Sequence, residues 1–469
     1  MFISTWDETP FQEEIFIPFR RVNIMKFHTI ELRVSVLILV MVLGGCAPFV
    51  QYRTEYDLCV NPTSELSPDC ENHAIQEFPA TDGARYLLSF IEFDDQGQLW
   101  DRKQMWSVID KLSTEAASKD LLITVFVHGW KHSAERTDEN IKTFRKVLAG
   151  LSENELLISQ NTGRPARQVT GIYLGWRGGS IKIPGVEELT FWDRKNTAQK
   201  VSRGGVTEVL SRLELLKRVK ENVSEGNSTT RLVIVGHSFG GAVVHSSLVQ
   251  ILENRFVRTT GPVGVQSDVE GFGNLVVLIN PAFEALQFAS LSDMSTERGT
   301  YFKSQLPVMA ILTSEADDAI RNSFPIGRHL STFFEKDRDI RRMNAVTRQE
   351  EIINEGDANV TAVGRFQPYE THRLYPSSDL PRGAAAQSGS SESVSSALVA
   401  KSAWEDDKPG SKIPIAGLTL ERSNISAARN PYMVIRVDKN LITDHNHIDD
   451  GRIIEFIKQL ILISTLTAE

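Results

Sequence analysis

One short stretch combines a serine with the two glycines that a catalytic turn needs. Residues 236–240 read Gly-His-Ser-Phe-Gly and fit the pattern G-x-S-x-G around Ser238. The apolar residues 232–235 predict a buried parallel strand before the pattern, and the residues through Leu252 predict a helix after it. A turn between strand and helix exposes the serine hydroxyl, and the glycines let the chain double back. The pattern therefore predicts a nucleophilic Ser238; the alternative is an incidental glycine turn.

A serine nucleophile needs a base, and the base needs an acid that orients it. In a parallel sheet such groups gather at the carboxyl ends of the strands. Asp317 and Asp318 follow a predicted strand over residues 308–312, with Glu315 nearby. Asp317 is the preferred acid by its distance past the strand, and Asp318 is the alternative.

The base should follow the last predicted strand, residues 432–437. His445 and His447 both lie in the loop after it, and His445 is the preferred base. His372 lies inside a long insertion and is a weaker candidate.

Backbone N–H groups are needed to bind the oxyanion. The residue after the nucleophile, Phe239, should provide one, and Trp130 in the His-Gly-Trp loop after strand 121–127 should provide the second. The alternatives for this loop are a metal pair at His128 and His132 or a plain turn. No carboxylate spacing of a zinc site accompanies the histidines, so no metal is expected.

Arg177 follows another predicted strand, residues 171–176, at the same end of the sheet. It is either a ligand for an anionic group of the substrate or, as we favour, the partner of an acidic side chain in a structural turn.

Taken in chain order, the oxyanion loop, Ser238, Asp317 and His445 have the order of the α/β-hydrolases. Residues 125–130 and 236–241 resemble that superfamily, most of all its bacterial lipase- and esterase-type members, and the resemblance runs from about residue 86 to the C-terminal helix without the insertion. It implies a serine hydrolase that cleaves a carboxylic ester, on a small-molecule or lipid substrate, through an acyl-enzyme on Ser238 and without a cofactor.

Two classes of alternative stay open. The same triad serves thioesterases, amidases and peptidases, and a non-catalytic envelope lipoprotein could keep the fold for binding alone. The long stretch between Asp317 and His445 departs from the family pattern and weakens the assignment of the histidine most.

Strands that alternate with helices predict a mostly parallel central sheet flanked by helices, and the resemblance implies that this sheet has the α/β-hydrolase fold. A long insertion, partly flexible, precedes the last strand. Within it a charged stretch over residues 333–354 predicts a solvated helix, and the small and polar residues 377–412 predict a flexible loop. Residues 191–195 are expected to form a polar-aromatic loop.

The chain is expected to divide into five segments. These are an N-terminal extension with a lipoprotein signal peptide (1–45), a tether and lead-in (46–82), the hydrolase core (83–318), a partly disordered insertion (319–430) and the C-terminal part of the core (431–469).

The apolar residues 34–45 are too short for a comfortable membrane span and are typical of a signal peptide. Residues 43–46, Leu-Gly-Gly-Cys, resemble a bacterial lipobox with lipid on Cys46, which predicts a lipid-anchored protein of the bacterial cell envelope. A short membrane anchor with an incidental cysteine is the alternative. The true start is either Met1 or Met25.

The remaining cysteines and the charge balance add two expectations. Cys59 and Cys70 are the only cysteines besides Cys46, and in an oxidising compartment they are expected to form a disulfide, although two unrelated thiols are the alternative. The net charge of -9, with no long basic run, gives no reason to expect a nucleic-acid partner. The oligomeric state is not predicted.

Overall fold

The computed structural model describes residues 49–179, 191–262, 264–317, 336–377, 390–406, 408, 410–448 and 450–465. The signal peptide, Cys46 and Asp318 lie outside these residues.

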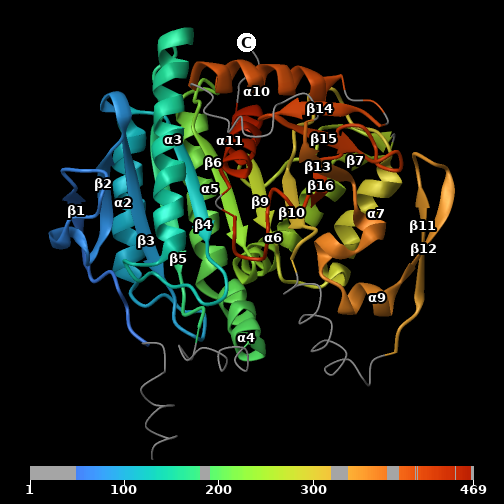
Figure 1. Cartoon of the computed structure of the whole chain (residues 1–469), viewed down its shortest axis with the longest axis horizontal. Coiled ribbons are helices and arrows are strands. Elements are labelled where there is room, and N and C mark those ends of the chain that lie inside the picture. The colour runs from blue at the N-terminus through green and yellow to red at the C-terminus, as the bar shows by residue number, and fades with distance from the viewer. Residues whose placement is uncertain are drawn as a thin grey trace, which may run out of the picture.

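A single twelve-stranded sheet organises the molecule (Figure 1). In sheet order its strands are β1 (Glu55–Val60), β2 (His73–Pro79), β3 (Arg85–Glu92), β5 (Gln168–Gly175), β4 (Leu121–Val127), β6 (Arg231–His237), β9 (Leu275–Ile279), β10 (Met309–Ser314), β16 (Tyr432–Val437), β13 (His372–Pro376), β15 (Leu418–Arg422) and β14 (Lys412–Ile415). From β3 to β13 all neighbours are parallel. The antiparallel pairs, β2–β3, β13–β15 and β15–β14, lie toward the two edges.

Two short pairs of strands stand apart from the large sheet. They are β7 (Thr260–Gly261) with β8 (Gly264–Val265), and the hairpin of β11 (Asp339–Asn344) with β12 (Gln349–Asn354).

Helices cover both faces of the sheet (Figure 1). The apolar side chains of α2 (Arg102–Ser118), α4 (Phe191–Val201), α5 (Thr207–Val223), α6 (Phe239–Arg258) and α7 (Ala289–Arg298) pack on one face. Those of α3 (Glu139–Thr162), α10 (Ser390–Glu405) and α11 (Gly451–Thr465) pack on the other. The short α9 (Glu355–Val360) follows the β11–β12 hairpin.

The central strands are apolar throughout because both of their faces are covered. In β4 every residue is buried, and Ile123, Val125 and Val127 join one core while Leu122 and Phe126 join the other. An unbroken apolar run is the pattern of such a strand.

The helices α2 and α3 begin and end at residues that stabilise helix termini. The Asp101 and Asp138 side chains accept backbone N–H bonds at the starts of α2 and α3. Gly163 ends α3 with φ of 73°, a conformation that glycine adopts without strain.

The mixed α/β class and the mostly parallel, helix-flanked sheet are confirmed. Three local predictions are wrong. The segment 46–82 is not merely a tether, because β1 and β2 extend the sheet from within it. The expected loop at 191–195 is the start of α4. The charged stretch expected as a helix over 333–354 forms the β11–β12 hairpin in its described part, residues 336–354.

The insertion 319–430 is a part of the sheet rather than an appendage. It supplies β13, β14 and β15, which continue the sheet beyond β16, and the expected flexible loop over 377–412 contains α10. Residues 378–389 of that loop lie outside the described residues.

The structure joins Cys59 and Cys70 in a disulfide, as expected, with their Cα atoms 5.6 Å apart. Among the described residues, no helix combines the length and the apolar character that crossing a membrane requires.

Candidate active site

Ser238 lies at the sharp turn between β6 and α6, as its sequence pattern predicts. Its φ of 55° and ψ of -121° are an uncommon conformation for a residue with a side chain. A Cβ at Gly236 would lie 2.8 Å from the carbonyl oxygen of Gly240, and a Cβ at Gly240 only 2.0 Å from that of Val127. Glycine is therefore required at both positions for the turn to close.

The structure brings Ser238, His445 and Asp317 together in one line of hydrogen bonds. The Ser238 Oγ lies 2.7 Å from Nε2 of His445, and Nδ1 of His445 lies 2.7 Å from Oδ2 of Asp317. Because a carboxylate only accepts, Nδ1 carries the proton and Nε2 is left to accept the serine proton. This is the geometry of a nucleophile, its base and the acid that orients the base.

The sheet explains how residues so distant in the chain meet. β4, β6, β9, β10 and β16 are consecutive parallel neighbours, and their carboxyl ends lead into the His-Gly-Trp loop, Ser238, Asn280, Asp317 and the His445 loop in that order. Ser238, His445 and Asp317 thus meet at the carboxyl ends of the central strands, where parallel sheets collect functional groups.

His445, not His447, faces the serine. The side chain of His445 is 13% exposed, whereas that of His447 is 66% exposed and bonds to Asp444. The Asp444 carboxylate accepts the backbone N–H groups of Asn446 and His447, so a tight turn points the two histidines in different directions. His372, the weaker candidate, is buried on β13, where its Nδ1 lies 2.8 Å from the Thr371 hydroxyl and its ring stacks on Trp404.

Asp317 is fully buried, and the nearby Glu315 is occupied elsewhere in an ion pair with Arg436 at 2.8 Å. The guanidinium of Arg365 donates to the backbone carbonyls of Glu315 at 3.2 Å and Asp317 at 3.4 Å. Arg365 belongs to the insertion, so the insertion supports the loop that carries the acid.

The His-Gly-Trp loop lies directly against Ser238. A Cβ on Gly129 would lie 2.6 Å from the Cβ of Ser238, so only glycine fits there. The loop is held by His128, whose Nε2 accepts the Trp176 N–H at 3.0 Å while the Trp176 indole donates to the His128 carbonyl at 3.1 Å. The approach of Gly129 agrees with an oxyanion loop; donation by the N–H groups of Trp130 and Phe239 remains a prediction.

The other polar residues of the loop region have structural partners. His132 Nδ1 lies 3.0 Å from the Asp138 carboxylate, whereas His128 Nε2 accepts the Trp176 N–H. The two histidines therefore have different partners. Arg177 forms an ion pair with Asp95, and Arg194 binds the same carboxylate at 2.9 Å. This agrees with the favoured interpretation of Arg177 as the partner of an acidic side chain.

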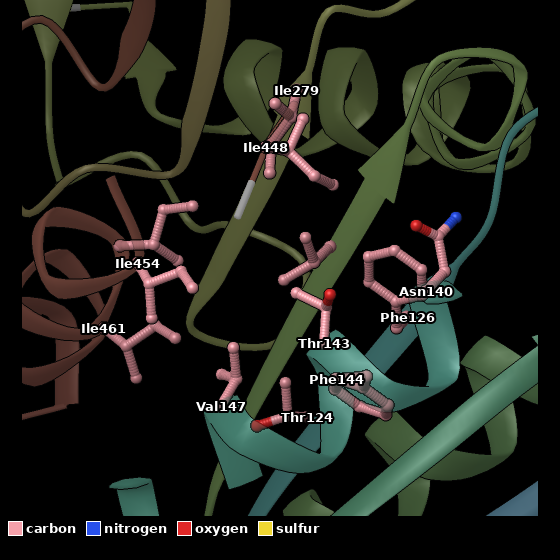
Figure 2. Close-up of a pocket in the computed structure, with 12 residues that line it drawn as sticks. Thr124, Phe126, Asn140, Thr143, Phe144, Val147, Ile279, Ile448, Ile454 and Ile461 are labelled. Atoms are coloured by element: carbon pink, nitrogen blue, oxygen red, sulfur yellow. The ribbon is translucent and has the colours of Figure 1, made fainter. Parts of the chain in front are cut away.

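An apolar pocket lies beside the site, between α3 and α11 (Figure 2). Phe126, Val235 and Ile279 line it from β4, β6 and β9, and Ile448, three residues after His445, lies next to Ile279 (Figure 2). No triad residue lines the pocket. It is therefore separate from Ser238, His445 and Asp317, and it lies on the face of the sheet opposite α6.

Three histidines are held neutral inside the protein. Burial lowers the pKa of His128 to about 4 and the pKa values of His237 and His245 to about 3. Neither ring nitrogen of His245 has a hydrogen-bond partner in the described part of the chain, and the ring stacks on Phe283 at 4.1 Å.

This predicts a loss of stability in acid. Below pH 6.5 the unfolded chain protonates these imidazoles while the folded protein does not, so unfolding is favoured as the pH falls toward 4. Each buried histidine removes about 1.4 kcal/mol of unfolding free energy per pH unit in that range. The measurement is urea unfolding of wild type and His245→Phe at pH 7 and at pH 5. The unfolding free energy lost between pH 7 and pH 5 should be about 2 kcal/mol smaller in the variant than in wild type. An equal loss in both proteins would count against a neutral, buried His245.

The sequence did not point to Arg365 or Asn280 as site residues. Arg365 donates to the carbonyl of Asp317, and Asn280 donates to the carbonyl of His445. Arg365 lies in an irregular part of the insertion with no motif around it. Asn280 directly follows the buried strand β9, and a polar residue at the carboxyl end of a central parallel strand is the signal that marks it.

Comparison of the chain with models of known protein families finds no match, and comparisons with curated proteins and with solved structures find none either.

Proposed function

We propose that the protein is a serine hydrolase with the α/β-hydrolase fold, and that it cleaves carboxylic esters through an acyl-enzyme on Ser238. The observation that carries the proposal is the pair of 2.7 Å contacts that join Ser238 to His445 and His445 to Asp317. The strained turn at Ser238 and the close approach of Gly129 add to it, because both are expected of a nucleophile elbow with an oxyanion loop.

The reaction has two halves. His445 Nε2 takes the Ser238 proton as the serine oxygen attacks the ester carbonyl, and His445 then gives the proton to the leaving alkoxide. Phe239 and Trp130 N–H groups stabilise the oxyanion, and Asp317 stabilises the imidazolium. Water attacks the acyl-enzyme with the same base, which releases the acid and restores Ser238.

We further propose that the protein is anchored by lipid on Cys46 in the bacterial cell envelope. The Cys59–Cys70 disulfide supports an oxidising compartment. An anchor of this kind would hold Ser238 near acyl lipids, which favours a lipase- or lysophospholipase-like role.

The nature of the leaving group decides between the proposal and its nearest alternatives. Purified protein is given p-nitrophenyl esters of short and long acids, a thioester and a p-nitroanilide of one matched acyl group. We expect the esters to be hydrolysed fastest, because p-nitrophenoxide is a less basic leaving group than either an alkyl thiolate or the nitrogen of an anilide. Turnover of the anilide or thioester in preference to the ester would reassign the protein as an amidase or thioesterase.

A further inference from the structure

The backbone carbonyl of His445 accepts two hydrogen bonds, from a side chain at the end of β6 and from one directly after β9. His237 Nε2 lies 3.0 Å and Asn280 Nδ2 lies 3.1 Å from this oxygen. Both donors are buried, with 1% and 0% of their surface exposed. A carbonyl oxygen has two lone pairs, so these donors use its full capacity.

The direction of each bond follows from chemistry. A carbonyl only accepts, so the neutral ring of His237 must carry its proton on Nε2. Burial, with a smaller contribution from the neighbouring His445, lowers the pKa of His237 to about 3, which keeps the ring neutral in the working range of pH.

The amide of Asn280 is oriented by its other contact. Its Oδ1 accepts the backbone N–H of Ser314 at 3.0 Å, which leaves the amide NH₂ directed at His445. Asn280 also has φ of 44°, an uncommon conformation for a residue other than glycine, and such strain clusters at functional sites.

His445 needs support of this kind because no regular element holds it. It lies in the irregular loop between β16 and α11, yet its imidazole must keep two contacts of 2.7 Å at once. His237 ends β6 and Asn280 follows β9, and these two strands are direct neighbours beside the loop. The bonds therefore tie the irregular loop that carries His445 to the ends of two central strands of the sheet.

We propose that His237 and Asn280 form a carbonyl clamp, a pair of positioning residues that fix the backbone of the catalytic base. The clamp rests on the proposed function, since its purpose is to hold His445 in line with Ser238. His237 is the variable residue before the serine in the G-x-S-x-G pattern, so the clamp gives this residue a role in positioning His445.

Two substitutions of His237 test the clamp in the full chain. His237→Met keeps the volume but removes the donor, and we expect kcat for ester hydrolysis to fall about 10- to 100-fold, since a displacement of about 1 Å has effects of that size. KM should change little, because the clamp does not touch the substrate. His237→Gln places an amide N–H near the position of Nε2 and should recover most of the lost kcat.

Asn280→Gly provides a second, independent variant, because glycine adopts positive φ without strain and only the side chain is lost. We expect the same fall in kcat with little change in KM. His245→Met is the matched control: it replaces a buried neutral histidine on α6 that has no hydrogen bond to the base loop, and it should keep the kcat of wild type.

A second measurement separates the clamp from the proposed function. Nitrogen-15 NMR of the histidine rings should show His237 as the neutral Nε2–H tautomer, whether or not the protein hydrolyses an ester. The Nδ1–H tautomer, or folded His237→Met and Asn280→Gly proteins with the kcat of wild type, would overturn the clamp. Failure of wild type to turn over any ester would overturn the function, and the NMR result would still decide the clamp.

Discussion

Replacing His445 with alanine is expected to lower kcat/KM for the proposed ester hydrolysis by about 10⁴- to 10⁶-fold, the range for loss of the base in a serine triad. The imidazole is 2.7 Å from the Ser238 oxygen, so without it the hydroxyl has no acceptor for its proton in the first step. The measurement is initial-rate hydrolysis of a p-nitrophenyl ester, with circular dichroism to show that the variant is folded.

His447→Ala is the matched control, two residues along the same loop. Its side chain is exposed and bonds only to the neighbouring Asp444 in the contacts recorded, so we expect activity within about twofold of wild type. If instead His447→Ala abolishes turnover and His445→Ala retains it, the base has been assigned to the wrong residue.

The sequence was most informative where one physical constraint dominates. Strands buried on both faces are apolar without interruption, which is why β4 and β16 were predicted with the bounds that the structure has. The turn at Ser238 was equally clear, because the lack of space at Gly236 and Gly240 leaves its mark on residue type.

Edge strands and exposed strands were harder to predict. The hairpin of β11 and β12 stands apart from the large sheet, so most of its side chains are polar and the alternation of a half-buried strand is weak. Its charge suggested a solvated helix. The added strands β13 to β15 pair only at one edge of the sheet, and pairing between distant segments has no local signal.

The choice between His445 and His447 also required three dimensions. Both follow the last strand, and only the turn made by Asp444 shows which ring faces the serine. The contacts of Arg365 and Asn280 arise in the same way, from donors and acceptors that are far apart in the chain. The residue types and their order predicted a serine, an acid and a histidine. The contacts in the folded chain show that Ser238, Asp317 and His445 are the residues that lie together.

The largest effect is expected at Ser238 itself. Ser238→Ala removes the nucleophile, so no acyl-enzyme can form, and ester turnover should fall by about 10⁶-fold, to the residual rate that the oxyanion hole and binding provide. The substitution deletes one oxygen, and the smaller side chain leaves the packing of Gly129 against this turn intact.

The most direct test of the account is the intact mass of the protein after treatment with a fluorophosphonate, which phosphonylates activated serines. We predict one adduct per chain in wild type, located on Ser238 by peptide mapping, and none in Ser238→Ala. Folded wild-type protein that gains no adduct, or an adduct that persists in Ser238→Ala, would contradict the assignment of Ser238 as the nucleophile.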